Sequence, residues 1–254
     1  MVFAARQSAK GRLPRNRQAG ALRARKGGLR RFIAGSAAVL LAIFFAPYVI
    51  APFYRVVDPV SVPMLWRWVN RERVQRTFVP LSRIPPTLTR AVIVAEDASF
   101  CRNPGIDLGA IREALRQSDD DLADARGAST ITQQTAKNLF LWPGHSVVRK
   151  ALEMPLALWL TLVLPKRRIL EIYLNVAEWG PNGQFGAEAA ARYAFGVPAH
   201  SLTALQAAKL AAILPNPSER SARRPSQLVL QLAELYARRA AAQSAVDACV
   251  WARR

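Results

Sequence analysis

The stretch PKRRILEIYLNVAEWG, residues 165–180, has the residue spacing of a helix with one buried side. Tyr173 and Leu174 follow Leu170 by three and four residues, so the three side chains share one face of an α-helix. Charged and amide residues occupy positions between them. We therefore expect a helix over 166–177 that acts mostly as scaffold.

Helical spacing continues on both sides of this stretch. After Pro85 and Pro86, Thr87 can cap a helix with Leu88 and Val92 on its apolar face. The alternation that marks a strand is nowhere long enough for a central sheet. The sequence thus predicts a mainly α fold, with a polar loop at 118–126 and further helices near 129–140, 147–164, 166–177, 186–195, 201–213 and 226–248.

The charge of the chain is concentrated at its N-terminus. The 254 residues carry a formal net charge of +19, and residues 1–31 hold ten Lys or Arg and no acid. Residues 32–54, FIAGSAAVLLAIFFAPYVIAPFY, contain no charge. As a helix this segment is roughly 34 Å long, enough to cross a bilayer core. We predict a basic cytoplasmic tail followed by a transmembrane helix, which Pro47 and Pro52 kink or end.

A cleaved signal peptide is the alternative to a membrane anchor. Its apolar region would be shorter, and proline follows both Ala46 and Ala51, where a cleavage site would need a permissive residue. The length of the apolar segment therefore favours the anchor. Because basic residues stay on the cytoplasmic side, everything after about residue 55 is expected to face outward.

After residue 55 the chain carries 25 basic and 17 acidic residues, an excess that suggests an anionic partner there. The basic tail is interpreted instead as a topology signal that contacts anionic lipid headgroups, not nucleic acid. Residues 55–86 form a membrane-proximal segment rich in Pro, Trp and Arg. Trp66 and Trp68 within it fit either the membrane interface or a lid over the following domain.

The two cysteines, Cys101 and Cys249, are too few for a disulfide framework, and no CxxC or Cys/His metal spacing is present. Pairing of the two and free buried thiols are both open. His145 and His200 stand alone in expected loops, so we interpret them as solvated.

Two acids, Glu96 and Asp97, end an apolar helix, and Phe100 follows them. A carboxylate that leaves an apolar helix beside an aromatic ring is a candidate general base with a raised pKa. A solvated acidic pair at a helix end is the alternative, and this segment alone does not decide between them.

The stretch GASTITQQTAKNL, residues 127–139, is rich in uncharged hydrogen-bonding side chains. Such a helix face suits a sugar or phosphate ligand, which needs many neutral donors and acceptors and one cation. An ordinary solvated face, the alternative, usually holds more Glu and Lys. The polar positions are Ser129 at the expected helix start, Thr130, Gln134 and Asn138 on one face, and Gln133 and Lys137 on the neighbouring stripe.

The following helix, VVRKALEMPLALWL from residue 147, places Arg149 and Glu153 four residues apart, with Lys150 beside them. Such a pair is by itself more typical of a structural contact. We expect Pro155 to disturb the helix locally.

Together these segments resemble glycosyltransferase family 51, the peptidoglycan glycosyltransferases that polymerise lipid II. The resemblance covers about residues 80–225 and implies a two-lobed, lysozyme-like helical domain, here 87–254, with 55–86 as a membrane-facing jaw. No S-x-x-K or K-T-G is present, which is typical of the monofunctional form. The motifs, in order, are ED-x-x-F-x-x-x-x-G (96–105), GASTITQQTAKN (127–138), RK-x-x-E (149–153) and K-x-x-ILE-x-YLN (166–175).

The resemblance implies formation of a β-1,4 linkage with inversion, between a glycan on undecaprenyl pyrophosphate and the GlcNAc 4-hydroxyl of lipid II. Glu96 is then the base, and Lys137 and Arg149 bind pyrophosphate with support from Lys150. Glu153 is the second catalytic glutamate, near the leaving group, and acts through water or a divalent metal. Substrate contacts carry over to Asp97, Phe100, Asn103, Ser129, Thr130, Gln133, Gln134 and Asn138.

The resemblance also sets the expected surroundings. No cofactor is required, and a divalent cation (Mg2+ or Mn2+) with Glu153 as its candidate ligand is left open. Expected partners are lipid II, the lipid-linked glycan strand, membrane lipids and other cell-wall synthesis or division proteins. The expected location is the bacterial inner membrane, single-pass, with the N-terminus cytoplasmic and the catalytic domain periplasmic.

Two positions depart from the family pattern. Asn103 stands where the family usually has His; Asn keeps a hydrogen bond but cannot titrate near neutral pH, so we expect a structural position. Ala194 stands where an aromatic pair is common, and only packing should change. The alternatives are a catalytically silent lipid II-binding scaffold, which Asn103 alone favours, and a lysozyme-like wall-cleaving enzyme, which would need an acid for a sugar leaving group.

Overall fold

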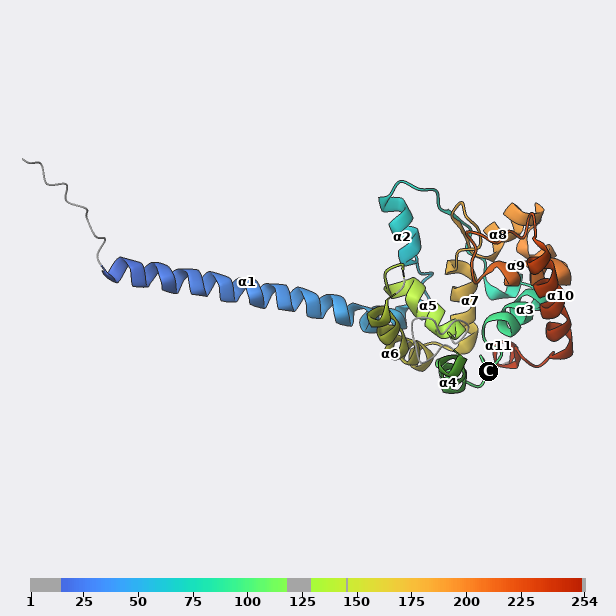
Figure 1. Ribbon diagram of the computed structural model, residues 1–254, viewed down its shortest axis with the longest axis horizontal. Coiled ribbons are helices and arrows are strands. Elements are labelled where there is room, and N and C mark those ends of the chain that lie inside the picture. The colour runs from blue at the N-terminus through green and yellow to red at the C-terminus, as the bar shows by residue number, and fades with distance from the viewer. Residues whose placement is uncertain (1–14, 118–128, 145, 253–254) are drawn as a thin grey trace, which may run out of the picture. The chain divides into compact units, whose positions relative to one another are not determined.

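The structure is a computed structural model that describes residues 15–117, 129–144 and 146–252. The chain divides into two compact units, residues 1–47 and 48–254. The first consists, where described, of the long helix α1 (Arg15–Ile50), whose last residues belong to the second unit (Figure 1). The expected loop at 118–126 and His145 lie outside the described residues.

One segment in the described part of the chain, Arg31–Arg55, is long and apolar enough to cross a membrane. It confirms the apolar helix expected from the sequence. Pro47 lies inside α1, which ends at Ile50, and a 3-10 helix, η1 (Ala51–Arg55), contains Pro52. The α-helical part therefore ends near the two prolines, as expected.

The second unit is helical, with one minimal sheet. Two strands of two residues each, β1 (Gln75–Arg76) and β2 (Gln184–Phe185), pair in parallel with Gln75 opposite Gln184. This confirms the mainly α fold. The remaining elements are α2 (Val62–Val69), η2 (Leu81–Arg83), α3 (Pro86–Glu96), α4 (Leu108–Gln117), α5 (Ile131–Phe140), α6 (Val147–Val163), α7 (Lys166–Val176), α8 (Ala187–Phe195), η3 (Ala199–Ser201), α9 (Ala204–Ile213), α10 (Gln227–Ala242) and α11 (Ala248–Trp251).

Helix α7 lies in the core, as its apolar spacing predicted. Leu170, Tyr173 and Leu174 are all buried. Asn175 is buried too, and its amide accepts from Val79 N and donates to Val79 O, both at 2.9 Å. The segment before α3 is thereby fastened to α7, so the membrane-proximal residues share the core of the domain.

Several expected helix boundaries are corrected. Thr87 is not a cap: α3 begins at Pro86, which fits the first turn because its missing N–H would be unpaired there. The N-cap of α5 is Thr130, not Ser129, and the N-cap of α9 is Thr203. Each of these threonines forms a capping box with the glutamine three residues after it. Helix α10 ends at Ala242, and α2 and α4 were not expected.

Helix α6 runs unbroken through Pro155, which corrects the expected local disturbance. Proline removes the hydrogen bond to the carbonyl of Ala151, and both residues are exposed, so water can pair with that carbonyl. On α2, Trp66 and Trp68 are each about half exposed, at 56% and 51%. Their exposure fits both contact with the membrane interface and a lid over the following domain, and both stay predictions.

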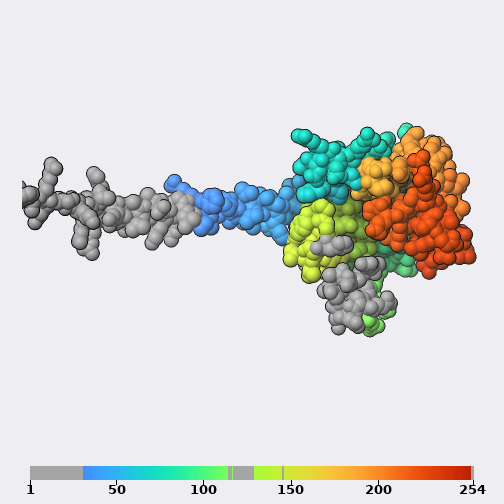
Figure 2. Space-filling view, turned by 45° about the horizontal axis from the view of Figure 1, so that its top comes forward, coloured from blue at the N-terminus to red at the C-terminus, as the bar shows by residue number. Residues whose placement is uncertain are grey.

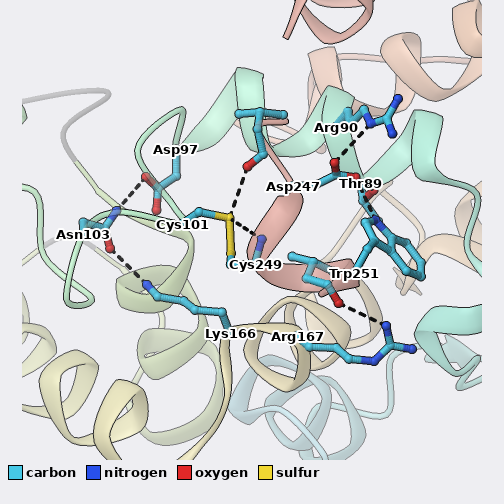
Figure 3. The surroundings of a disulfide bond; sticks show 12 residues. Thr89, Arg90, Asp97, Cys101, Asn103, Lys166, Arg167, Asp247, Cys249 and Trp251 are labelled. Atoms are coloured by element: carbon cyan, nitrogen blue, oxygen red, sulfur yellow. Dashed lines mark hydrogen bonds and ion pairs between the residues drawn. A yellow bond between two sulfur atoms is a disulfide. The ribbon is translucent and has the colours of Figure 1, made fainter. Parts of the chain in front are cut away.

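The two cysteines form a disulfide, with an S–S distance of 2.03 Å (Figure 3). The bond joins the turn after α3 to α11. Nearby, Asp247 accepts from Thr89 Oγ1 at 3.0 Å, Arg90 Nε at 3.1 Å and Trp251 Nε1 at 2.8 Å (Figure 3). The C-terminal segment is thus fixed to α3, the helix that carries Glu96.

Candidate functional site

Glu96 is the last residue of α3, and its two carboxylate oxygens differ. Oε2 accepts a hydrogen bond of 2.6 Å from Gln134 Nε2 on α5. Oε1 is buried without a hydrogen-bond partner among the described residues. Burial raises the pKa of Glu96, against the opposing effects of the Gln134 hydrogen bond and Lys137. The result is a carboxylate with one oxygen held and one free to accept a proton.

The amide of Gln134 is held in turn from α7. Tyr173 Oη donates to Gln134 Oε1 at 3.1 Å, and the tyrosine is almost fully buried. This bond occupies the amide oxygen and leaves the NH2 group directed at the carboxylate. Tyr173, Gln134 and Glu96 therefore form a chain of hydrogen bonds across three helices.

The neighbouring acid, Asp97, has a structural position. Its Oδ2 accepts from Ile131 N at 3.1 Å, at the start of α5, and its Oδ1 accepts from Asn103 Nδ2 at 2.8 Å. Thr130, the cap of α5, donates to Gly105 O at 2.6 Å. These bonds fix the start of α5 to the turn after α3 and so set the distance between Gln134 and Glu96.

Gly105 brings the same turn against α6. Its φ is +107°, and a Cβ there would lie 2.8 Å from Ala157 O. A larger residue would be strained in conformation and would push the turn away from α6. The final glycine of the first sequence motif is thus explained by close backbone approach.

Five residues expected to contact substrate are instead buried in this framework. Phe100 is fully buried, with Lys166 Nζ 4.6 Å from its ring centroid, and Asn103 accepts from Lys166 Nζ at 3.2 Å and from Gly105 N at 3.0 Å. Burial lowers the pKa of Lys166 to about 8. These contacts place the side chains in the framework of the site, while direct contact with substrate and the structural expectation for Asn103 stay predictions. The five are Asp97, Phe100, Asn103, Thr130 and Gln133.

A cationic cluster lies on the first turns of α6. Both oxygens of the buried Glu153 are occupied: Oε1 by Arg149 Nη1 and Oε2 by Lys150 Nζ at 2.9 Å. Lys150 Nζ also donates to Ser129 Oγ at 2.6 Å. The two cations are held in place by one carboxylate, so the cluster keeps a net positive charge.

Lys137 on α5 interacts electrostatically with both glutamates. Burial lowers its pKa, Arg149 and Lys150 lower it further, and the charges of Glu153 and Glu96 oppose this. No carboxylate among the described residues forms an ion pair with its ammonium group. Lys137 thus adds an ammonium group without an ion-pair partner among the described residues, and its charge interacts with Glu96, Glu153 and the Arg149–Lys150 pair. Asn138, next to it on α5, is partly exposed and keeps its expected role as a prediction.

The residues around Glu153 do not fit a divalent metal ion. Hard cations need several oxygen ligands, whereas Glu153 is a single carboxylate whose oxygens are both bonded to cations. The described residues hold no cluster of three or more His, Cys, Asp or Glu that could supply more ligands. A metal at this position would have to displace Arg149 or Lys150.

Sequence reasoning missed three contributors. Tyr173 was expected as core alone, because its spacing showed the buried face and not the hydroxyl. Arg220 and Tyr236 belong to the segment after α9 and to α10; the charge of Arg220 lowers the pKa of Glu96, and that of Glu96 raises the pKa of Tyr236. No local pattern marks these two, since only the fold brings them to Glu96.

Comparison with known proteins gives a consistent result. A family model described as Transglycosylase matches residues 64–241. A Nitrobacter winogradskyi protein named biosynthetic peptidoglycan transglycosylase is 53% identical over 214 residues, 84% of this chain and 94% of its own. A protein of the same name from Rhodopseudomonas palustris TIE-1 is 56% identical over 204 residues, which are 80% of this chain and 86% of its own. One from Agrobacterium fabrum is 46% identical over 213 residues, 83% of this chain and 93% of its own.

Proposed function

This chain belongs to the transglycosylase family, and we propose that it polymerises lipid II into the β-1,4 glycan strands of peptidoglycan. The donor is a glycan strand linked through its terminal MurNAc to undecaprenyl pyrophosphate. The acceptor is the GlcNAc 4-hydroxyl of lipid II. Each step joins the two sugars with inversion and releases undecaprenyl pyrophosphate.

The bond changes assign a task to each side of the site. The acceptor oxygen forms a bond to the anomeric carbon of the donor MurNAc while the bond from that carbon to the pyrophosphate oxygen breaks. The hydroxyl proton passes to Glu96 Oε1, the oxygen without a partner among the described residues. The raised pKa of Glu96 makes the carboxylate a stronger base than an ordinary glutamate.

The departing pyrophosphate needs cations and no acid. Lys137 has no ion-pair partner among the described residues, and Arg149 and Lys150 together outweigh the charge of Glu153. Charge that develops on the leaving oxygen is stabilised by these groups, which are already in place. Glu153 holds the two cations in position, and no step passes through a metal ion.

The observation that carries the proposal is the juxtaposition of a free, buried carboxylate oxygen with an uncompensated cationic cluster. The scaffold alternative loses its one supporting feature, because Asn103 serves the framework and not the reacting groups. A wall-cleaving enzyme would need an acid at the sugar leaving group, where this site instead gathers cations.

The same reasoning extends to location and partners. We place residues 32–54 across the bacterial inner membrane, with the basic tail in the cytoplasm and residues after about 55 in the periplasm. The Cys101–Cys249 disulfide supports that side, because such bonds persist in oxidising compartments. Lipid II and the lipid-linked strand are the partners that the chemistry requires, and other cell-wall synthesis or division proteins stay an expectation.

Polymerisation of lipid II in vesicles, with products separated on a gel, tests the proposal. Wild type should make polymer without added metal, and Glu96→Gln should lose at least about a hundredfold in rate. Glu234→Gln, an exposed glutamate on α10, is the matched control and should keep full activity. Lipid II binding without polymer from wild type would support a scaffold, and fragments released from finished wall would support a hydrolase.

A further inference from the structure

A cavity of about 650 Å3 opens between the segment after α2 and the residues around β2 and α8. In Figure 2 the teal surface of the first segment borders the orange surface of the second. None of the residues assigned above to the reaction lines it. Its wall includes Arg67, Arg71, Glu72, Arg73, Asn182 and Tyr193.

The charge of this cavity is positive and largely unpaired. Arg67 is neutralised, because its guanidinium pairs with Glu72 at 2.8 Å and with Glu178 at 2.6 Å. Arg71 and Arg73 are exposed and form no ion pair with any described residue. Two guanidinium groups therefore face the cavity while its one acid, Glu72, is already engaged.

The segment that carries these arginines is held in a defined position. Gln75 N donates to Gly183 O at 2.8 Å, and a Cβ on Gly183 would lie 2.0 Å from Arg73 O. Arg71 has a φ of +59°, which non-glycine residues seldom adopt. Tyr193, which also lines the cavity, has the guanidinium of Arg223 5.8 Å from its ring centroid.

A second, smaller cavity adjoins this one. Pro181 and Tyr193 line both cavities, and the wall of the smaller one includes Arg220. The charge of Arg220 acts on the carboxylate of Glu96. The residues that line the two cavities are separate from the Arg149–Lys150 cluster on α6.

We propose that this cavity binds the carboxylates of the peptide that the acceptor lipid II carries on its MurNAc. The inference rests on the proposed function. Guanidinium groups bind carboxylates through paired, charge-assisted hydrogen bonds, and the acidic stem peptide is the anionic part of the acceptor besides its pyrophosphate. The volume lies within the range of pockets that enclose small ligands, so several amino-acid residues fit.

The test compares Arg71→Gln/Arg73→Gln with wild type, as full-length protein in the same vesicles. Each is given lipid II with its native stem and lipid II whose stem carboxylates are converted to carboxamides. The variant should lose about tenfold in kcat/KM for native lipid II, mainly through KM. Wild type and variant should be equally slow on the amidated substrate. Arg83→Gln/Arg238→Gln, two exposed arginines outside the cavity, should match wild type on both.

Equal losses on both substrates, or no loss on either, would overturn the proposal. A loss that follows the anionic lipid content of the vesicles, whatever the stem, would mean that the arginines contact membrane and would overturn it too. If wild type polymerises neither substrate, the proposed function fails on its own account. Calorimetry with a soluble muramoyl peptide then still decides: binding by wild type but not by the variant supports the cavity, and equal binding or none refutes it.

Discussion

Glu96 and Glu153 belong to one site but have opposite surroundings. Glu96 meets one neutral donor, the Gln134 amide, and its second oxygen has no partner among the described residues. Glu153 has a cation on each oxygen. Two identical side chains thus differ in their contacts: one has an oxygen without a partner among the described residues, and the other bonds a cation with each oxygen.

The difference shows that environment, not residue type, assigns the roles. A base must be able to take a proton, and burial without a counter-charge raises the pKa that makes this favourable. A glutamate whose two oxygens are bonded to Arg149 and Lys150 serves to position those cations. Variants at the two positions test this difference, because the change in the free energy of unfolding can be measured for each.

The largest expected difference is in the stability of variants in which one of the two glutamates is replaced by glutamine. Glu153→Gln leaves the buried Arg149 without its counter-charge, which should lower the free energy of unfolding by about 3 kcal/mol and Tm by roughly 6–12 °C. Glu96→Gln removes a buried charge that has no ion pair, so Tm should stay level or rise. Thermal unfolding of the detergent-solubilised proteins at neutral pH measures both.

The stability difference between Glu96→Gln and wild type should also depend on pH, in a direction set by the raised pKa of Glu96. Folded Glu96 binds its proton more tightly than the unfolded chain does, so its contribution to stability is complete at low pH and is lost as pH rises through the raised pKa. The stability of Glu96→Gln relative to wild type should therefore increase as pH rises. Glu72→Gln, which breaks a half-exposed pair, is the control and should cost less than about 1 kcal/mol. Equal losses of Tm in Glu96→Gln and Glu153→Gln would contradict the claim that only Glu153 is a structural ion-pair partner.

Gln134→Leu tests the single bond that stabilises the Glu96 carboxylate. Without that bond the pKa of Glu96 rises further, so the acid limb of kcat/KM should move to higher pH. Below that limb the rate should fall by roughly tenfold, the effect of a hydrogen bond to a charged group. Gln231→Leu, an exposed position on α10, should leave the profile unchanged. An unmoved acid limb in Gln134→Leu would assign the essential ionisation to another group.

The sequence was sufficient for the parts of this site that depend on local spacing. Arg149 and Glu153 meet because they are four residues apart on one helix, and the apolar face of α7 follows from its period. The order of the four motifs indicated the family, and with it Glu96. Each of these inferences uses information held within about one helix or one motif.

The rest depends on contacts between distant segments. Nothing around Gln134 tells that it faces Glu96 while Gln133 turns inward to close a capping box. The pairing of Cys101 with Cys249 joins residues 148 positions apart, and only the packing of α11 against the turn after α3 brings them together. The resemblance therefore suggested five ligand contacts whose side chains the fold buries in its framework: Asp97, Phe100, Asn103, Thr130 and Gln133.

Tyr173→Phe should act in the same direction as Gln134→Leu but less strongly. The hydroxyl orients the Gln134 amide and does not touch the carboxylate, so its loss leaves the Glu96 bond possible but less populated. A neutral hydrogen bond contributes about 1 kcal/mol, so roughly a fivefold loss in kcat/KM on the acid side is expected. Tyr54→Phe in η1 is the matched control, since its ring stacks on Phe140 and its hydroxyl makes no bond to Gln134. The pH profile distinguishes orientation from simple packing, because a packing defect would lower the rate at every pH.

Asn103→His, which introduces the residue typical of the family, should have the smallest effect. Asn103 bonds to Asp97, Gly105 and Lys166, and none of these holds the free oxygen of Glu96. An imidazole can donate to Asp97 and accept from Gly105 N, so the turn should survive and the acid limb should stay in place. If instead the limb moved or a new ionisation appeared, a titrating group at position 103 would share the work of Glu96. The contrast between one free and one ion-paired glutamate would then no longer account for the proton by itself.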